Sequence, residues 1–450
     1  MIIRNRADLI SRGNTRAREI ALDIVEYALQ KVDSFDLVRN IVKLQNNQLT
    51  IGQSCFVLNN IHDIFVVGGG KQVTFVAAAL EELLQSKIRE GIVVEKKGWG
   101  RKLERIRVIE GGHPVPDEGT LKGTNEIIST VKKAERDDLV IVCVTGGCTS
   151  LTLSPPEGIT LKDVMEVSKL LLESGAPLED MNIVRKHLSL IGGGKLALLA
   201  SQANIVSLIA VDEVAGVPWG PTVPDTTTFT DARTILMRYD LWDTVPESIR
   251  DYLVRADVKQ ETAKSSDFTN SGVRVTNVVF AENGMICNAA ERRATELGLN
   301  TSILTTRLEG EAKDVGVVLS CIANEIEVNQ RPIRTPCALI AGGETTVTIK
   351  GDHGEGGRNQ ELALAAAVKL SGNKRAALVS IGTDGTDGPT DIAGAIIDGY
   401  TAETAKHKNM DLFQYLKKHD SSTVFRRIGG AIYTSNTGTN LMDLVVLCVT

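Results

Sequence analysis

The sequence has few aromatic residues and no long apolar segment, and each shortage excludes a class of function. Aromatic residues make up 4% of the 450 residues, and the formal net charge is -6. A mildly acidic chain of this kind is a poor candidate for general nucleic-acid binding. Apolar stretches such as residues 139–144 and 205–211 are far too short to span a membrane. Small anionic ligands stay possible, because they need positive charge only locally.

The chain also lacks the features of an exported protein. Its seven cysteines are odd in number and include no CxxC pair, which indicates reduced thiols in so long a chain. Residues 1–18 carry scattered charges and no uninterrupted apolar core of a secretory signal. We therefore expect a cytoplasmic protein of ordinary globular composition that binds small molecules and neither nucleic acid nor membranes. Assembly into a homo-oligomer is left open.

A short apolar run that ends at a glycine-rich or acidic loop recurs along the chain. Examples are IFVVGGGK at 64–71, VIVCVTGG at 140–147, CALIAGGETT at 337–346 and ALVSIGTDGTDG at 377–388. Runs rich in Val and Ile that stop at Gly predict buried parallel strands. Between several of them lie amphipathic segments of helical length, such as 73–90 and 161–173. This alternation predicts an α/β fold with covered parallel sheets.

The polar, helix-like stretch that follows residue 231 suggests a boundary between two α/β domains. We expect a larger domain over residues 1–235, a helical linker over 236–270 and a smaller domain over 271–450. Loops from both domains are expected to face a shared cleft. Ligands bind beyond the carboxyl ends of the strands in such sheets, and the Gly, Asp and Thr clusters fall there.

The first glycine loop, GGGK at 68–71, follows a strand and precedes a helix. Consecutive glycines such as Gly69 and Gly70 let backbone N–H groups approach an anion, and the helix amino terminus adds partial positive charge. Lys71 would add a full charge. The alternative is a tight turn with a solvated lysine. A second GGGK at 192–195 follows no clear strand, which favours a purely structural turn.

A second cationic loop, GEGGRNQ at 354–360, opens an alanine-rich helix. Arg358 could grip a carboxylate or a phosphate with two parallel hydrogen bonds. Asn359 follows it, and Glu344 and Thr345 end the preceding strand. We expect these three residues to orient ligands beside Arg358.

Three carboxylates follow the strand at 377–382, in the loop GTDGTDGPTD. Asp384, Asp387 and Asp391 are spaced by three and four residues, which does not fit an EF-hand loop. Three acids on a glycine-rich loop still suit a hard cation such as Mg2+, and one of them could act as a general base. The alternative is that they cap turns and helix starts.

Further candidates are less specific. His113 lies between glycines and prolines in GGHPVPD, although a lone histidine is more often structural. Arg185, Lys186 and His187 are consecutive, so they cannot share one helical face. They form either a basic turn near an anion or a solvated helix segment. Cys148 in TGGCTS reads as a small residue in a glycine turn, because no activating base is adjacent in sequence.

Taken together, a Gly/Lys loop, a Gly/Arg loop and an Asp-rich loop at strand ends are the parts that phosphoryl transfer needs. A kinase for a small anionic acceptor uses all three. The chain has no zinc motif, and no GxGxxG opens a helix after the first strand, which argues against a dinucleotide-dependent reductase. An anion-binding sensor without catalysis is disfavoured by the three nearby acids.

At this point the sequence resembles the glycerate 2-kinases of the MOFRL type. The matching segments are GGHPVPDEGT, NIVRKHLSLIGGGKLA, GPTVPD, GGETTVTIKGDHGEGGRNQELALAAA, GTDGTDGPTDIAGAIID and TGTNLMDL, between about residues 68 and 444. The resemblance implies transfer of the γ-phosphate of ATP to the 2-hydroxyl of D-glycerate, with Mg2+ or another divalent ion. It also implies a larger Rossmann-like domain, a smaller carboxyl-terminal domain and an active site between them.

The resemblance makes Lys71 and Arg358 the active-site pair, the same residues that the loops indicate. The chain departs from the family pattern at TGGCTSL (145–151), VDE (211–213) and SNTGTN (435–440), which affects ligand contacts there. The alternative function is an NAD(P)H-dependent hydroxypyruvate reductase. The predicted site comprises Lys71, Arg358 and Asp387 as catalytic residues; Gly69, Gly70, His113, Arg185, Glu344, Thr345 and Asn359 as substrate- or phosphate-binding residues; and Asp384 and Asp391 as metal ligands.

Overall fold

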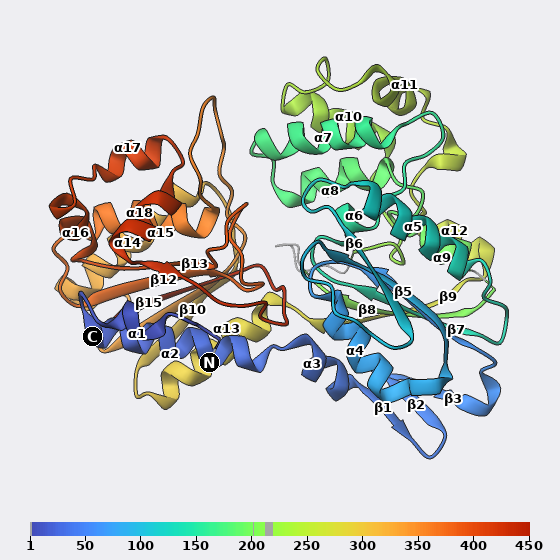
Figure 1. The fold of residues 1–450 in the computed structure, drawn as a ribbon, viewed down its shortest axis with the longest axis horizontal. Helices are drawn as coiled ribbons and strands as arrows, with labels where there is room; N and C mark the ends of the chain where they lie inside the picture. The colour runs from blue at the N-terminus through green and yellow to red at the C-terminus, as the bar shows by residue number, and fades with distance from the viewer. Residues whose placement is uncertain (1, 201, 212–218) are drawn as a thin grey trace. The chain divides into compact units, whose positions relative to one another are not determined.

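The computed structural model describes residues 2–200, 202–211 and 219–450, and the chain divides into two compact α/β units (Figure 1). Unit 2 takes the chain from Ser34 to Ala281. Unit 1 combines the amino-terminal segment, which ends at Asp33, with Glu282–Thr450. These units differ from the predicted division at residues 235 and 270, and the pairing of one strand and one helix explains the difference.

Unit 2 is built on a parallel sheet in the order β6-β5-β4-β7-β8-β9. Numbered along the chain from β4, this is the order 3-2-1-4-5-6 of Rossmann domains, as predicted. The order reverses between β4 and β7, so the crevice for ligands in such a sheet lies at their carboxyl ends. The strands are β4 Ile64–Gly69, β5 Ile88–Lys96, β6 Ile106–Gly111, β7 Leu139–Val144, β8 Asn204–Ala210 and β9 Arg274–Ala281.

The last strand of this sheet, β9, comes from the segment expected to open the second domain. It pairs with β8 in parallel from Asn204 and Arg274 onward. The stretch between the two strands forms helices and does not link domains: its apolar side packs on other helices of unit 2. Its exposed polar residues hide this packing from a composition argument. The helices are α10 Phe229–Arg238, α11 Glu247–Arg255 and α12 Ser265–Ser271.

Helices cover both faces of the unit 2 sheet, and a small antiparallel sheet precedes it. The predicted helix at 161–173 is confirmed as α7, while the one at 73–90 ends earlier, at Leu84, because β5 already begins at Ile88. The remaining elements are α3 Ser34–Ile41, β1 Val42–Gln45, β2 Gln48–Ile51, β3 Ser54–Val57, α4 Val73–Leu84, α5 Glu118–Val131, α6 Cys148–Leu151, α7 Leu161–Glu173, α8 Leu178–His187 and α9 Lys195–Leu199.

Unit 1 contains a mixed sheet in the order β10-β11-β15-β12-β13-β14. The expected parallel pairing holds for β10 and β11, but β15 lies between β11 and β12 and runs antiparallel to both. Because β15 is buried on both faces, its apolar run looks the same whatever its direction. The strands are β10 Asn300–Leu308, β11 Cys337–Gly343, β12 Ala376–Gly382, β13 Gly394–Asp398, β14 Ala431–Ile432 and β15 Asp443–Val449.

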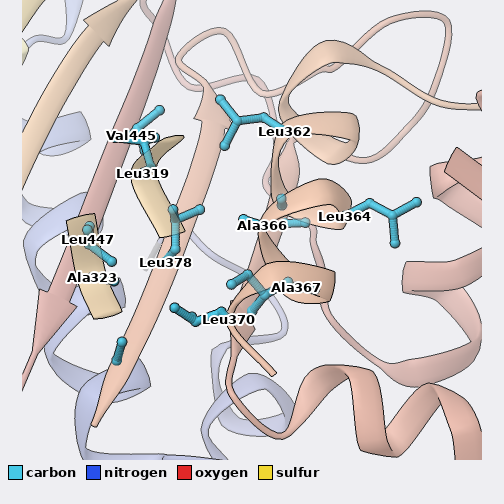
Figure 2. Packing of buried hydrophobic residues seen from close by; sticks show 14 of the residues in the cluster. Leu319, Ala323, Leu362, Leu364, Ala366, Ala367, Leu370, Leu378, Val445 and Leu447 are labelled. Carbon is cyan, nitrogen blue, oxygen red and sulfur yellow. The ribbon is translucent and has the colours of Figure 1, made fainter. Parts of the chain in front are cut away.

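The core of unit 1 forms where α14 (Ala312–Asn329) and α15 (Arg358–Lys369) pack on β12 and β15 (Figure 2). The alanines of α15 and Gly316 of α14 let the two helices approach closely: a Cβ added at Gly316 would lie 2.2 Å from the Leu362 carbonyl oxygen. Figure 2 labels Leu319, Ala323, Leu362, Leu364, Ala366, Ala367, Leu370, Leu378, Val445 and Leu447.

The amino-terminal helix α2 (Thr15–Lys31) belongs to this unit because it packs against α13, β12 and β15. A buried ion pair between Arg18 and Asp398, 2.6 Å apart, adds to the packing. No helix in the described ranges is long and apolar enough to cross a membrane. The other helices are α1 Arg6–Ile10, α13 Asn283–Glu296, α16 Thr401–His407, α17 Leu412–Lys417 and α18 Ser421–Ile428.

Candidate active site

The loop after β4 is held in place by its own backbone. Gly70 has φ +133°, and a Cβ there would lie 2.2 Å from the Thr145 hydroxyl, so only glycine fits beside β7. The Gly70 N–H donates to the Val94 carbonyl at 3.0 Å, and the Lys71 N–H donates to the Gly146 carbonyl at 2.7 Å. Gly69 lies within the strand ladder. These amides therefore fix the loop at the point where the strand order reverses.

The amino terminus of α4 is occupied by a carboxylate of the protein. Glu95, at the end of β5, accepts hydrogen bonds from the N–H groups of Gln72, Thr74 and Lys96 and from the Thr74 hydroxyl, at 2.9 to 3.2 Å. Burial raises the pKa of Glu95 to about 7 against these hydrogen bonds. The loop therefore offers an anion the half-buried Lys71 side chain, and the geometry does not favour the predicted amide cradle.

The loops after β6 and β7 meet at the same edge of the sheet. The His113 ring packs on Gly147, where an added Cβ would lie 2.5 Å from Nε2. The Ser150 hydroxyl donates to the Pro114 carbonyl at 2.7 Å. Because β5 and β4 lie between β6 and β7, the loop that carries His113 reaches across their ends. It therefore covers the switch point at which Lys71 lies.

Arg185, on α8, points to the same place. Its Nη2 makes a long contact of 3.5 Å with the Pro114 carbonyl, and its Nε is buried with no hydrogen-bond partner in the ranges that the structure describes. The residue is 4% exposed, and burial alone lowers its pKa to about 10. No carboxylate of the described residues pairs with it. The hydroxyls of Thr145, in the loop after β7, and of Thr149, in α6, are likewise buried without a partner in the described part of the chain.

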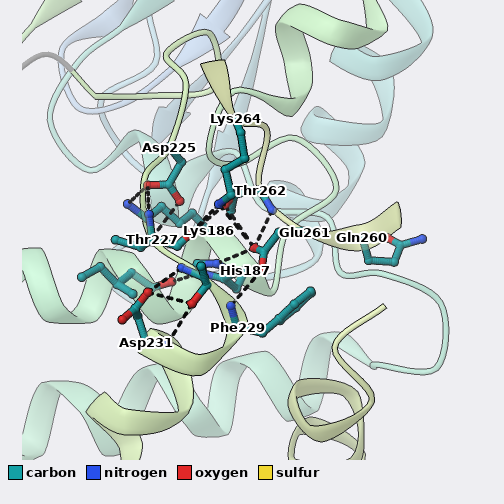
Figure 3. A network of polar contacts seen from close by, with 12 residues as sticks. Lys186, His187, Asp225, Thr227, Phe229, Asp231, Gln260, Glu261, Thr262 and Lys264 are labelled. Carbon is teal, nitrogen blue, oxygen red and sulfur yellow. Dashed lines mark hydrogen bonds and ion pairs between the residues drawn. The ribbon is translucent and has the colours of Figure 1, made fainter. Parts of the chain in front are cut away.

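The neighbours of Arg185 on α8 have structural partners instead (Figure 3). Lys186 pairs with Asp225 at 2.9 Å, and His187 Nε2 lies 2.9 Å from Glu261. Burial would raise the pKa of Glu261, but hydrogen bonds that include the one with His187 lower it to about 2. The three consecutive residues thus face different sides, as predicted, and only Arg185 is directed at the sheet edge.

Lys195, from the second GGGK, belongs to this polar region as well. Its Nζ donates to the Gln260 carbonyl at 3.3 Å, and burial lowers its pKa to about 8. Gly193 and Gly194 have positive φ angles of 57° and 80°, and a Cβ on Gly194 would lie 2.8 Å from the Val223 carbonyl oxygen. The geometry fits the structural turn expected for this motif.

In unit 1, Arg358 opens α15 and is surrounded by carboxylates. Its Nε and Nη2 donate to the two Asp443 oxygens at 2.6 and 3.0 Å, and its Nη1 lies 2.5 Å from Glu344. Burial would lower the pKa of Arg358, but Asp443 and Glu344 raise it well above its usual range. Arg358 thus makes with Asp443 the bidentate pair of hydrogen bonds that was predicted for a substrate anion. Thr345 is buried next to Glu344.

Asp387 is bound to the amino terminus of α15. Its oxygens accept hydrogen bonds from the backbone and side-chain N–H groups of Asn359 and Gln360, at 2.9 to 3.2 Å. The residue is 2% exposed, and burial raises its pKa, with the Asp443 charge adding to the effect. These four bonds are those of an anchoring carboxylate. The catalytic role of Asp387 stays a prediction that this geometry does not favour.

The three aspartates of the acidic loop do not converge on one point. Asp391 is exposed and pairs with Arg426 at 2.6 Å, while buried Asp384 accepts from the Thr386 N–H and hydroxyl. Within the described residues, one group of three candidate metal-ligating side chains gathers elsewhere. It consists of His62, Asp63 and Asp138, at the amino ends of β4 and β7, where Asp138 already accepts two backbone N–H groups.

Sequence reasoning missed Glu95 and Asp443, the carboxylates that organise the two cationic loops. Glu95 is the next-to-last residue of β5 and Asp443 is the first residue of β15, so an acid at the edge of an apolar strand is the signal that could have found them. Cys148 is buried and contacts the Thr152 hydroxyl, as fits a small residue in a turn. Of the VDE departure, residues 212 and 213 lie outside the described residues.

Two family models match separate parts of the chain. A family model described as a domain of unknown function (DUF4147) matches residues 20–254, and the model of the MOFRL family matches residues 337–443. A glycerate 2-kinase of Pyrococcus horikoshii is 41% identical over 96% of this chain and 97% of its own. The chain belongs to the MOFRL-type glycerate kinase family.

Two further relatives show how the family is named. The crystal structure of a glycerate kinase from Thermotoga maritima is 36% identical, covers 96% of this chain and 99% of its own, and superimposes with a TM-score of 0.76. A putative hydroxypyruvate reductase of Agrobacterium vitis is 39% identical over 85% of this chain and 98% of its own. Family members therefore carry both names that the sequence analysis considered, and the two-domain α/β fold of the MOFRL-type kinases is the fold of this chain.

Proposed function

We propose that this protein is a glycerate 2-kinase, which transfers the γ-phosphoryl group of ATP to the 2-hydroxyl of D-glycerate and gives ADP and 2-phosphoglycerate. The observation that carries the proposal is the 41% identity with the Pyrococcus glycerate 2-kinase over nearly the whole of both chains. All seven cysteines are free thiols, which supports action in the reducing cytoplasm.

In this proposal Lys71 supplies the charge that the transferring phosphoryl group needs. It lies at the carboxyl end of β4, where the strand order of a Rossmann sheet reverses and ligands bind. Phosphoryl transfer depends on positioning and charge neutralisation, and an ammonium group provides both without any covalent step. The hydrogen bonds of Gly70 to β5 and of Lys71 to the loop after β7 hold the loop still, so this charge needs no rearrangement.

Arg358 acts on the site through its carboxylates. Because Asp443 takes two of its N–H groups and Glu344 a third, Arg358 orients these acids and does not present an open edge to an anion. Glu344 follows β11 directly and would accept a hydrogen bond from a substrate hydroxyl. Asn359, which donates to both Asp443 and Asp387, holds the group together.

ATP brings a divalent cation, and the acidic loop offers limited support for it. Mg2+ keeps several waters and is bound by one or two carboxylates together with substrate phosphates, where it neutralises developing charge. Asp387 is saturated by four hydrogen bonds, and Asp391 is exposed and paired with Arg426. Asp384, buried after β12, accepts the N–H and hydroxyl of Thr386 through one oxygen, and it is the residue of this loop that we assign to Mg2+.

The second candidate, an NAD(P)H-dependent hydroxypyruvate reductase, is favoured by the Rossmann strand order and by the name of the Agrobacterium relative. In dinucleotide-binding domains an acid at the end of the second strand binds a ribose, and the first helix amino terminus receives the pyrophosphate. Here Glu95 occupies that strand end, yet its oxygens bind the amino terminus of α4. One carboxylate thus fills both places, which argues against the reductase.

A product assay tests the proposal. The purified protein is incubated with ATP, MgCl2 and D-glycerate, and the products are read by phosphorus NMR. Resonances of ADP and 2-phosphoglycerate are expected. A 3-phosphoglycerate resonance would keep the kinase and overturn the position of transfer. Unchanged ATP, together with NADH oxidation on addition of hydroxypyruvate, would overturn the proposal in favour of the reductase.

A further inference from the structure

Arg185 is a buried cation whose charge no carboxylate of the described residues balances. It is 4% exposed, and among the described residues its Nε has no partner and its one polar contact is the 3.5 Å approach to the Pro114 carbonyl. Buried charges in proteins are paired or serve a ligand. Arg18, equally buried in unit 1, shows the usual solution, since it pairs with Asp398 at 2.6 Å.

The surroundings of Arg185 identify a place for a ligand. The Pro114 carbonyl, which Arg185 approaches, also accepts a hydrogen bond from the hydroxyl of Ser150, in the short helix α6 that follows β7. Two further buried hydroxyls, of Thr145 in the loop after β7 and of Thr149 in α6, lack partners among the residues that the structure describes. Polar atoms left unsatisfied at one edge of a sheet indicate that a bound molecule completes their hydrogen bonds.

The loop also connects Arg185 to Lys71. Gly146, which accepts the Lys71 N–H at 2.7 Å, immediately precedes the glycine on which His113 packs. Arg185 and Lys71 thus serve one edge of the unit 2 sheet, at the switch point between β4 and β7. Two cations at such a point suit a reaction between two anionic substrates, one cation for each.

We propose that Arg185 binds the carboxylate of the phosphoryl acceptor; this rests on the proposed function, in which the acceptor is glycerate. One unpaired guanidinium balances the single charge of a carboxylate, whereas a phosphate group would bring nearly two charges to a buried site. The planar edge of a guanidinium also matches the two oxygens of a carboxylate. In glycerate the reacting hydroxyl is on the carbon next to the carboxylate, so Arg185 also positions the attacking oxygen.

The test compares two acceptors and two arginines. Arg185→Gln removes the charge, Arg185→Lys keeps it without the planar edge, and Arg255→Gln changes an exposed arginine of the same unit as a control. D-glycerate and its amide, D-glyceramide, differ only in the charged group. We expect wild-type protein and Arg255→Gln to prefer glycerate strongly. In Arg185→Gln, kcat/KM for glycerate should fall about 100-fold while the value for the amide stays unchanged, because a charged bidentate pair is lost.

A binding measurement separates this proposal from the function. Without nucleotide, D-glycerate should raise the Tm of the wild type and of Arg255→Gln but not that of Arg185→Gln. Arg185→Gln without ligand should unfold at the wild-type temperature or above it, since an unpaired buried charge has been removed. If the wild type does not transfer the phosphoryl group but shows this pattern of Tm changes, the proposed kinase function is wrong and the carboxylate site at Arg185 is retained.

Three outcomes overturn the assignment. An unchanged KM for glycerate in Arg185→Gln together with a lower Tm would make Arg185 a structural residue. A raised KM for ATP with an unchanged KM for glycerate would mean that the guanidinium pairs with the phosphates of the donor. Absence of any glycerate effect on the wild-type Tm would remove the binding site itself.

Discussion

At the scale of single residues, the candidate cations of the two units differ in what balances their charge. Arg358 is held by Asp443 and Glu344, and its surroundings carry a net negative charge. Arg185 has no such partner in the described part of the chain. A residue of the first kind organises a site, whereas a residue of the second kind is ready for an anionic ligand. The same residue type therefore has two roles, which only the partners reveal.

Lys71 gives a prediction at this scale. Lys71→Ala should lower kcat/KM for phosphoryl transfer by about 100- to 1000-fold, because a preorganised charge is lost from the transition state. The Tm should hardly change, since the backbone of Lys71 makes the bond that fixes the loop. Steady-state kinetics and thermal unfolding check both parts, with exposed Lys102→Ala as the control. Turnover within threefold of wild type would remove Lys71 from the mechanism.

At the scale of elements, one helix in each unit begins at a buried carboxylate that comes from another strand or loop. Asp387 binds the first residues of α15, and Glu95 binds those of α4. Each acid satisfies N–H groups that a helix amino terminus leaves unpaired. Neither helix amino terminus is therefore open to a phosphate, and the cations of the loops take over that task.

Replacement of Asp387 separates anchoring from catalysis. In Asp387→Asn an amide N–H2 group would face two N–H donors of α15, so the free energy of unfolding should fall by about 2–4 kcal/mol. Asp391→Asn, at an exposed ion pair, should change it by less than about 0.5 kcal/mol. Urea unfolding of both variants measures the difference. Full stability of Asp387→Asn with activity lost would restore the catalytic role that the sequence suggested.

Glu95 predicts a pH dependence. Its pKa rises from 4.5 in the unfolded chain to about 7, so across this window the folded state binds a proton that the unfolded state has lost. The contribution of Glu95 to the free energy of unfolding therefore decreases as the pH rises from 4.5 to about 7, by up to about 3 kcal/mol, and is constant above. Glu95→Gln should abolish this part of the pH profile, measured by urea unfolding. Exposed Glu104→Gln should keep it, and identical profiles for wild type and Glu95→Gln would contradict the assignment.

The sequence predicts these elements better than their partners. Valine- and isoleucine-rich runs before glycine predict the positions of β4, β7, β11 and β12 correctly. A strand that is buried on both faces needs a continuous apolar run, which can be read from the local sequence. The antiparallel direction of β15 leaves no such trace. Lys71 and Arg358 could be found from their loops, but Asp443 is 85 residues from Arg358, and nothing local indicates that the two side chains meet.

At the scale of the whole molecule, the division of the chain follows packing and not sequence order. The amino-terminal helix α2 completes unit 1, while β9 closes the sheet of unit 2. A boundary inferred from composition assigns both elements to the wrong unit, because composition does not show on which sheet their apolar residues pack. Only the long-range pairing, such as that of Arg18 with Asp398, decides to which unit each belongs.

This arrangement predicts that residues 282–450 cannot fold alone, whereas the same segment joined through a flexible linker of about 15 residues to residues 2–33 can. Without α2, the faces of β12 and β15 on which this helix packs are uncovered. Asp398 also loses its partner, Arg18. Circular dichroism and thermal unfolding of both proteins check this. The control is Leu22→Asp in the protein that joins residues 282–450 to residues 2–33, here called the permuted protein, since Leu22 is fully buried. We expect a cooperative transition only in the permuted protein without that substitution. If residues 282–450 alone unfold with the same Tm as the permuted protein, α2 does not contribute to the stability of unit 1. The side chains buried on α2 are Ala17, Arg18, Ala21, Leu22, Ile24, Val25, Glu26, Ala28 and Leu29.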